Sequence, residues 1–412
     1  MPVRLLIAEP APGGHHLSSY SRYLVREARR RGWSPVLVTS PQAQGHPALE
    51  MLADEFSDEL AVLQGPPVSL EQTEGVSGLV ARQFRFFDWH RKAVAQASKS
   101  ARIDVVMIMS FDSIDRVVAL FGLPTGSLPA AGLSVGVRYH WPRFGMTAKR
   151  RRDFVDRRLF ERALSNPGLK TLFVIDELYA EYAETAGGKL AGKVALIPDP
   201  GEVVCMADHS SSRESLDIAP DALVILVYGG ITERKGIELL IKTVAATEGS
   251  RNVVIVLAGE CSDGARRLLE GEDARRLAER GSLRVRDFFH DQQQEGEVFS
   301  AADMVWVAYS PEFLKRSAVM SQAAQAGIPC IAMAGGLIAR TVAAHGFGPV
   351  LSRPCGQELL ELLDKVSCQP EMLRRWSGNA RAHGRTCSGK AFGEAICDRL
   401  ALIDQAASGL SR

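Results

Sequence analysis

The segment Val227–Leu240 carries the residue types best suited to holding a phosphate. It reads VYGGITERKGIELL: an apolar run meets Gly229 and Gly230, and Arg234 and Lys235 then precede an amphipathic helical pattern. A strand that breaks at glycines and restarts as a helix directs backbone N–H groups and the positive helix end at one point. The two cations would add charge there. The same pattern is also typical of an ordinary strand–helix turn with surface cations, so both interpretations stay open at this point.

A second polar segment follows the apolar run 304–308. It contains Glu312, after which a helix is expected to begin near Ser317 and to end at Gly327. The carboxylate of Glu312 and the amide of Gln322 could then both face a sugar nucleotide. The alternatives are a solvated loop acid and a helix-surface amide.

Glycines and histidines follow the predicted first strand, Val3–Ala8. Gly13, Gly14, His15 and His16 precede the first helical pattern, where glycines permit close approach of a ligand and the helix start favours an anion. The segment is not GxGxxG and lacks an acidic residue at the distance expected for a ribose contact, which argues against a nicotinamide cofactor. A histidine pair bonded to local backbone is the other interpretation.

A third group of polar residues lies where the predicted strand Gly132–Tyr139 ends. Arg138 and His140 would point the same way, because side chains alternate along a strand. Asp112 follows another predicted strand, 104–110, in a similar place. A surface strand end explains the same residues without a ligand.

A basic stretch covers residues 149–158, in which arginines alternate with apolar side chains. A domain helix with a solvated cationic face is the favoured interpretation. An interfacial helix that contacts anionic lipid stays open.

Short apolar runs alternate with helical patterns along the whole chain, which predicts parallel sheets with helices on both faces. Prolines and glycine near residues 197–201, followed by the polar run 209–214, predict a linker near residues 200–220. The predicted fold class is therefore α/β, with two Rossmann-like domains facing across a cleft. The predicted domains are 1–205, completed by the C-terminal helix 391–412, and 206–390. Ligands of such sheets bind beyond the carboxyl ends of the strands.

Composition narrows the function classes. The chain has 412 residues, 46% hydrophobic and 24% charged, with a net charge of +1, which gives no basic excess for nucleic acid. The seven cysteines form no CxxC pair, so free thiols are expected and a structural zinc is not. No apolar run is long enough for a signal peptide or a membrane-spanning helix. We expect a cytoplasmic protein, with docking on the inner face of a membrane left open.

These segments together resemble the GT-B-fold retaining glycosyltransferases, specifically glycosyltransferase family 4. Residues 229–236 look like the family's G-R-x(4)-K-G motif, residues 300–303 look like its A-A-D, and residues 322–329 look like its E-A-x-A-x-G-x-P. The chain departs from the pattern at three points. Gly230 stands where the family has Arg, Gln322 stands where it has Glu, and Glu312 precedes Gln322 by ten positions where the family's two acids stand eight apart. A divergent member is implied.

The resemblance implies a role for several residues. Lys235 would neutralise the leaving diphosphate, Glu312 would hold donor-sugar hydroxyls, and His140 would contact the donor sugar from the first domain. Gln322 would bind the ribose. The further donor-binding candidates are Gly13, Gly14, His15, His16, Arg138, Gly229, Gly230, Arg234 and Ser317.

The implied reaction moves a hexosyl group, with retention, from a nucleotide-sugar to an acceptor hydroxyl. It needs no metal and no cofactor besides the nucleotide-sugar co-substrate. The acceptor would be a glycan, a lipid-linked molecule or a small molecule, and bacterial envelope glycan or glycoconjugate synthesis is the commonest setting in the family. Two alternatives stay open, a catalytically degenerate glycosyltransferase-like binding protein and a sugar-nucleotide epimerase of the same fold.

Overall fold

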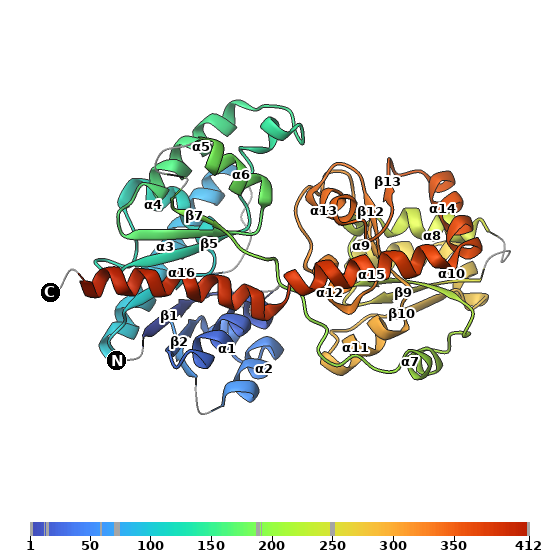
Figure 1. Cartoon of the computed structure of the whole chain (residues 1–412), viewed down its shortest axis with the longest axis horizontal. Helices are drawn as coiled ribbons and strands as arrows, with labels where there is room; N and C mark the ends of the chain where they lie inside the picture. The colour runs from blue at the N-terminus through green and yellow to red at the C-terminus, as the bar shows by residue number, and fades with distance from the viewer. Residues whose placement is uncertain are drawn as a thin grey trace. The chain divides into compact units, whose positions relative to one another are not determined.

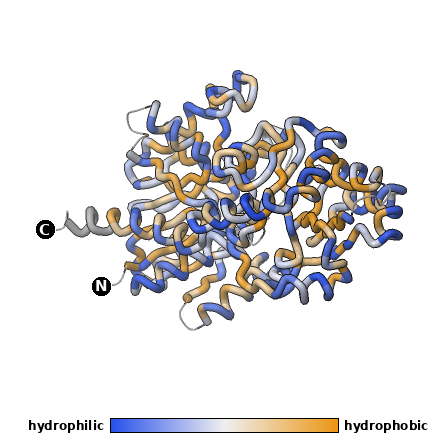
Figure 2. The backbone as a smooth tube through the Cα atoms, turned by 45° about the vertical axis from the view of Figure 1, so that its right-hand side comes forward, coloured by the Kyte–Doolittle hydropathy of each residue, from blue (hydrophilic) through white to orange (hydrophobic). Residues whose placement is uncertain are grey.

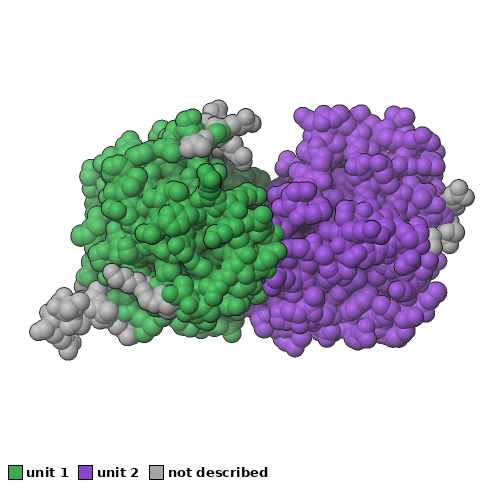
Figure 3. Space-filling view, turned by 90° about the horizontal axis from the view of Figure 1, so that it is seen from above, with its two compact units in different colours: residues 1–198, 389–412 green, residues 199–388 purple. Residues whose placement is uncertain are grey.

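The computed structural model describes residues 3–11, 13, 16–57, 60–69, 75–186, 190, 192–247 and 252–409. The chain forms two compact units, which Figure 3 shows in different colours. The first comprises Met1–Pro198 with Gly389–Arg412, and the second comprises Asp199–Ser388. The chain therefore passes between the units after Pro198 and after Ser388, and the predicted boundary at 205/206 lies inside the second unit.

The predicted linker near residues 200–220 is wrong, because these residues belong to the second unit and include a helix. Helix α7 covers His209–Ser215, and the carboxylate of Asp208 caps it by accepting from the backbone N–H of Ser211 at 3.0 Å. Arg213 is buried and pairs with Asp303 at 2.7 Å. The polar run is thus a capped helix that is fixed by a buried arginine.

The first unit is built on a parallel sheet of seven strands in the order β3-β2-β1-β4-β5-β6-β7. The strands are β1 Arg4–Ala8, β2 Ser34–Thr39, β3 Ala61–Gln64, β4 Val105–Ile108, β5 Ala130–Ser134, β6 Leu169–Val174 and β7 Val194–Leu196. The helices are α1 Arg22–Arg30, α2 Pro47–Phe56, α3 Gly75–Ser100, α4 Asp115–Phe121, α5 Arg151–Leu164, α6 Glu177–Ala186 and α16 Gly389–Gly409.

Alternating strand residues build two separate cores, one on each face of this sheet. Leu6 and Ala8 of β1 pack with α3, α4, α5 and α6, whereas Leu5 and Ile7 pack with α1, α2 and α16. Figure 2 shows hydrophobic stretches alternating with hydrophilic ones along the backbone. This is the doubly wound arrangement predicted from the alternating pattern.

Helix α16, at the end of the chain, completes the first unit (Figure 1). Phe392, Ile396 and Leu400 are fully buried, and Phe392 stacks on Tyr20 with ring centroids 5.3 Å apart. Burying each such side chain stabilises the fold by roughly 1.5–3 kcal/mol. A Cβ on Gly393 would lie 2.6 Å from Cβ of Glu27, so glycine permits the close approach of α16 to α1.

The second unit repeats the plan with six parallel strands in the order β10-β9-β8-β11-β12-β13. The strands are β8 Leu223–Tyr228, β9 Val253–Ala258, β10 Leu283–Arg286, β11 Met304–Val307, β12 Cys330–Met333 and β13 Val350–Leu351. Besides α7, the helices are α8 Ile237–Ala245, α9 Asp263–Leu269, α10 Glu272–Glu279, α11 Gln292–Ala301, α12 Ala318–Ala326, α13 Leu337–His345, α14 Gly356–Cys368 and α15 Pro370–Thr386.

Two groups of strands differ from the sequence prediction. The strand predicted at Gly132–Tyr139 is β5, Ala130–Ser134, so residues 135–140 form a loop beyond its carboxyl end. The edge strands β3 Ala61–Gln64, β7 Val194–Leu196 and β13 Val350–Leu351 were not predicted. They are short, and β3 is mostly exposed, so they lack the buried apolar run that marks a central strand.

Candidate functional site

Each sheet has one pair of neighbouring strands after which the chain turns to opposite faces. In the second unit the pair is β8 and β11: α8 packs on the face of Ile225 and Val227, whereas α12 packs on the face of Val305 and Val307. The loops therefore diverge and leave a crevice at the carboxyl edge, which is where open α/β sheets bind ligands.

Glycines allow the backbone to crowd into this edge. Gly229 follows β8 with φ at +81°, and a Cβ on Gly259, after β9, would lie 2.4 Å from the Gly229 carbonyl oxygen. Gly236 has φ at +67°, and a Cβ there would lie 2.6 Å from the Ala308 carbonyl oxygen. Only glycine satisfies both conditions without strain.

Lys235 projects its ammonium group into this edge. It ends a 3-10 turn, Glu233–Lys235, and the residue is only 4% exposed. Its Nζ donates to the Tyr228 carbonyl oxygen and lies 3.4 Å from the Tyr309 hydroxyl. Among the described residues no carboxylate pairs with it, so this buried charge is available to an anion.

The α12 start lies beside Lys235. Ser317 is the N-cap residue, and its Oγ lies 3.1 Å from the Tyr309 hydroxyl. One helical turn later, Nε2 of Gln322 donates to Glu295 at 2.6 Å, while the buried Oε1 has no hydrogen-bond partner in the described part of the chain. The structure therefore brings Lys235, Ser317 and the two glycine turns together.

Three other candidates occupy the rim of this crevice. Arg234 is exposed, with its guanidinium 4.8 Å from the Phe313 ring centroid. Glu312 is exposed in the turn after β11. Gly230 is exposed, and a Cβ there would meet nothing within 4 Å. The arginine that the family motif has at this position would therefore have open space for its side chain.

The sequence reasoning missed several side chains at this edge. Tyr309 links Lys235 to Ser317, and Phe288 and His290, beyond β10, stack with centroids 4.5 Å apart. Asp199 and Arg316 form a buried ion pair at 3.9 Å. Position just after a strand could have pointed to Tyr309 and Phe288, but no local signal joins Asp199 to Arg316.

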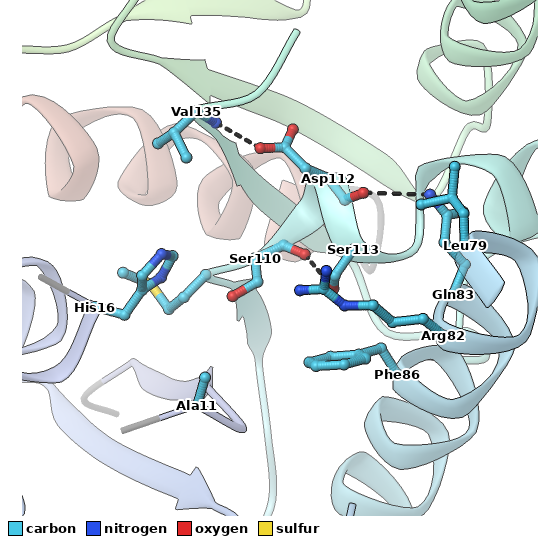
Figure 4. A pocket seen from close by; sticks show the side chains of 11 residues that line it. Ala11, His16, Leu79, Arg82, Gln83, Phe86, Ser110, Asp112, Ser113 and Val135 are labelled. Carbon is cyan, nitrogen blue, oxygen red and sulfur yellow. Dashed lines mark hydrogen bonds between the residues drawn. The ribbon is translucent and has the colours of Figure 1, made fainter. Parts of the chain in front are cut away.

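In the first unit the diverging pair is β1 and β4, and a cavity of about 280 Å³ lies at their carboxyl ends (Figure 4). Glu9 follows β1 directly and is fully buried. Nδ1 of His16 donates to Glu9 at 2.8 Å, Ser110 donates to the same oxygen at 2.8 Å, and the Ala11 amide donates to the other oxygen at 2.9 Å.

The Glu9–His16 pair shifts both groups toward their charged forms. Burial alone would raise the pKa of Glu9, but the His16 charge and the donated hydrogen bonds lower it overall. Burial would likewise lower the pKa of His16, and Glu9 raises it overall. The pair therefore joins a buried carboxylate to a partly exposed imidazole and fixes the imidazole at the cavity wall.

The other carboxylates near the cavity already have partners. Asp112 accepts from the Ser134 hydroxyl and, at 2.8 Å, from the Val135 amide. Asp115 accepts from Gln83 at 2.6 Å, and burial together with Asp112 raises the pKa of Asp115 to about 6. These acids hold the loops after β4 and β5 in place.

His140 and Arg138 do not share a strand face, contrary to the sequence prediction, because both lie in the loop and turn after β5. His140 is 1% exposed, and its Nε2 donates to Asp176 at 2.9 Å within a group of aromatic rings. Arg138 is exposed and lies over Trp141, 5.6 Å from its ring centroid. Contact of His140 with a donor sugar stays a prediction that requires its ring to become accessible.

The remaining candidates follow β1. Gly13 is exposed, whereas Gly14 and His15 lie outside the described residues. Among the described residues no group of three or more His, Cys, Asp or Glu side chains could hold a metal ion. In the same residues no helix is both long enough and apolar enough to span a membrane.

Comparison with known proteins finds a family match within the second unit. Residues 208–383, which lie within the second unit, match the family described as Glycosyl transferases group 1. The chain is also similar to D-inositol 3-phosphate glycosyltransferase of Actinosynnema mirum, with 29% identity over 189 residues. That match covers 43% of this chain and 44% of the relative.

Solved structures share the fold over nearly the whole chain. Sucrose-phosphate synthase from Thermosynechococcus elongatus superposes with a TM-score of 0.73 and 17% identity over 98% of this chain and 100% of that one. HepE of Anabaena, solved with UDP and glucose, gives a TM-score of 0.67 and 16% identity over 97% of this chain and 99% of that one. The predicted fold class, with two Rossmann-like domains of the GT-B type, is confirmed.

Proposed function

We propose that the protein transfers a hexosyl group from a nucleotide-sugar to an acceptor hydroxyl, with retention and without a metal, as a divergent member of family 4. The buried ammonium of Lys235 between the glycine turn and the start of α12 carries this proposal. A nucleoside diphosphate would meet three positive features there: Lys235, backbone N–H groups after β8, and the N-terminus of α12. The similarity to a protein solved with UDP and glucose supports a nucleotide ligand.

In the proposed reaction the bond from the sugar anomeric carbon to the diphosphate oxygen breaks and a bond to the acceptor oxygen forms. The acceptor proton passes to the leaving phosphate oxygen on the same face of the sugar. Lys235 stabilises the charge that develops on the diphosphate, Glu312 orients sugar hydroxyls, and Oε1 of Gln322 accepts from a ribose hydroxyl. The first unit binds the acceptor, and the reaction belongs to bacterial envelope glycan or glycoconjugate synthesis.

A screen of UDP-, GDP-, ADP- and dTDP-sugars by thermal shift tests the proposal, because a ligand that binds the folded state raises its stability by mass action. NMR of the products then shows whether a glycoside forms and with which anomeric configuration. A nucleotide that binds without transfer or hydrolysis would instead indicate a binding protein, and release of a 2-epimer would indicate an epimerase. An inverted glycoside would overturn the retaining mechanism.

Peripheral membrane contact is a separate part of the proposal, and helix α5 supports it. Phe154 and Val155 are 55% and 53% exposed, and the guanidiniums of Arg157 and Arg158 lie over the Phe154 ring. Part of the helix charge is neutralised, since Arg152 pairs with Asp156 at 3.2 Å. Sedimentation with anionic and neutral vesicles tests the contact, which Phe154→Ser should weaken only with the anionic ones.

A further inference from the structure

A cationic side chain at the cavity of the first unit forms no ion pair with any described residue. Arg82 extends from α3 toward Ser110 and Ser113 (Figure 4). Its guanidinium makes no ion pair with a described residue, and its Nε is buried without a hydrogen-bond partner there. Its guanidinium carbon lies 5.5 Å from the centroid of the Phe86 ring. Leaving such donors unpaired costs free energy, so a bound acceptor group would stabilise the site.

His16 adds a second donor to the same wall. Because Glu9 takes Nδ1 at 2.8 Å, the other ring nitrogen has no hydrogen-bond partner among the described residues. Ser110 and Ser113 place hydroxyls on the cavity wall, although each already donates, to Glu9 and to the Ser110 carbonyl oxygen. Their oxygens can still accept from a ligand hydroxyl.

The described carboxylates at this cavity are held by other residues and form no ion pair with Arg82. Asp112 is held by Ser134 and Val135, and Glu9 is held by His16. A neighbouring hollow of about 310 Å³ shares Gln83 and Asp112 with the cavity and adds Arg138, whose guanidinium also lacks a carboxylate partner in the described chain. Two guanidinium groups at this edge, those of Arg82 and Arg138, therefore form no ion pair with a described carboxylate.

We infer that this cavity selects an acceptor that is small, rich in hydroxyl groups and anionic, with its phosphate or carboxylate bound by Arg82 and His16. That the ligand is the acceptor rests on the proposed function. That the ligand is anionic and rich in hydroxyl groups rests on the residues of this unit alone. A volume of about 280 Å³ is at the lower end of ligand pockets, so one sugar- or polyol-sized unit fills it. The anion could belong to a soluble sugar phosphate or to a lipid headgroup.

Titration of the protein with candidate acceptors, in the absence of a nucleotide-sugar, tests the inference. The probes are glucose 6-phosphate, myo-inositol 1-phosphate and glucuronate, with glucose and myo-inositol as neutral counterparts and phosphatidylinositol vesicles as the lipid arm. The readout is the NMR signal of the His16 ring, assigned with His16→Gln. The titration is carried out in the Lys235→Ala variant, which removes anion binding at the second unit. Failure of the acceptor inference is then distinguishable from failure of the proposed donor site.

We expect at least one anionic probe to shift the His16 signal and its neutral counterpart to bind at least tenfold more weakly, because hydrogen bonds to a charged group are stronger than those between neutral groups. Arg82→Gln should remove that preference. Arg91→Gln is the matched control, since Arg91 lies on the same helix, 61% exposed and paired with Asp88. A response to vesicles alone assigns the anion to a lipid, and a response to soluble probes assigns it to a free molecule. Equal binding of charged and neutral probes, no response to any probe, or unchanged preference in Arg82→Gln overturns the inference.

Discussion

The two crevices, after β8 and β11 and after β1 and β4, share one topology and differ in chemistry. In the second unit the edge is made of glycine backbone and one buried lysine, Lys235, with no carboxylate partner among the described residues. In the first unit a fully buried carboxylate, Glu9, holds a histidine, and a guanidinium from a distant helix is left over. The fold supplies the crevice in both cases, and the residues just beyond the strands decide what it can bind.

This difference suggests a division of labour between the sites. Backbone N–H groups and a point charge suit a diphosphate, whose charge grows as it leaves. Fixed side-chain donors of defined geometry suit recognition of a molecule that must be selected from many others. Substitutions at each edge should therefore affect different measurements.

The largest expected effect is from Lys235→Ala. Removal of one preorganised donor to a developing oxyanion typically costs on the order of a hundredfold or more in rate, and here few other cations replace it. We expect kcat/KM for transfer to fall by at least that factor. Arg234→Ala is the control, since Arg234 is exposed and stacked on Phe313 at 4.8 Å, and it should cost much less. Full activity in Lys235→Ala would remove the basis of the comparison.

The next effect concerns the Glu9–His16 pair and is seen in stability. His16 has a raised folded pKa, so its contribution is fully present below its ordinary value of 6.5 and is lost as pH rises through the raised value. Glu9 has a lowered folded pKa, so its contribution is present above its ordinary value of 4.5 and is lost as pH falls through the lowered one. The window between pH 4.5 and pH 6.5 therefore has both contributions.

Glu9→Gln should lower the free energy of unfolding by about 2 kcal/mol in that window, and by less at higher pH. Denaturant unfolding across pH measures it. Glu238→Gln is a matched control, because Glu238 is 59% exposed and its pair with Lys242 is a surface pair of small effect. A loss that does not vary with pH would show that the pair is not ionised as described.

Glu312→Gln gives a smaller and more selective effect. Loss of a charge-assisted hydrogen bond to the sugar, worth roughly 1.5–3 kcal/mol, should lower kcat by about tenfold or more. Nucleotide affinity, measured by calorimetry with the diphosphate alone, should barely change, because that ligand lacks the sugar. If affinity falls and kcat does not, Glu312 belongs to nucleotide binding.

The candidate site of the second unit could be predicted from the sequence because most of its residues lie close together in the chain. Gly229, Lys235 and Gly236 lie within one strand–turn–helix, and Ser317 follows the next strand at the switch point. The local pattern of apolar residues and glycines is what fixes these positions. The partner of Arg316, by contrast, is Asp199, which is brought to it only by packing.

The site of the first unit could be predicted only in part, because His16 was a candidate whereas Glu9 and Arg82 were not. Glu9 and His16 follow β1, whereas Ser110 follows β4 and Arg82 sits inside a long helix with no motif around it. The loop after β5 was predicted as strand because Val135 and Val137 continue the apolar alternation. Instead, the Asp112 carboxylate accepts a hydrogen bond from the Val135 amide at 2.8 Å, and the strand ends at Ser134. A side-chain acceptor more than twenty residues away left no signal in the pattern itself.

The smallest expected effect comes from returning the family's arginine with Gly230→Arg. A Cβ at Gly230 meets nothing within 4 Å, and the residue does not have a positive φ, so the fold should tolerate the side chain with a change of less than about 0.5 kcal/mol. An added exposed cation near the diphosphate is worth at most about 1 kcal/mol, so calorimetry should show nucleoside diphosphate binding tightened less than about fivefold. Gly229→Ala is the control: its φ of +81° should make alanine there destabilising by about 1–2 kcal/mol. The effect of Gly230→Arg should also weaken as salt is raised. Unchanged or weaker nucleotide binding in a stably folded Gly230→Arg protein would mean that the diphosphate does not lie beside this turn, and the contrast between a phosphate-binding edge and an acceptor-selecting edge would then fail.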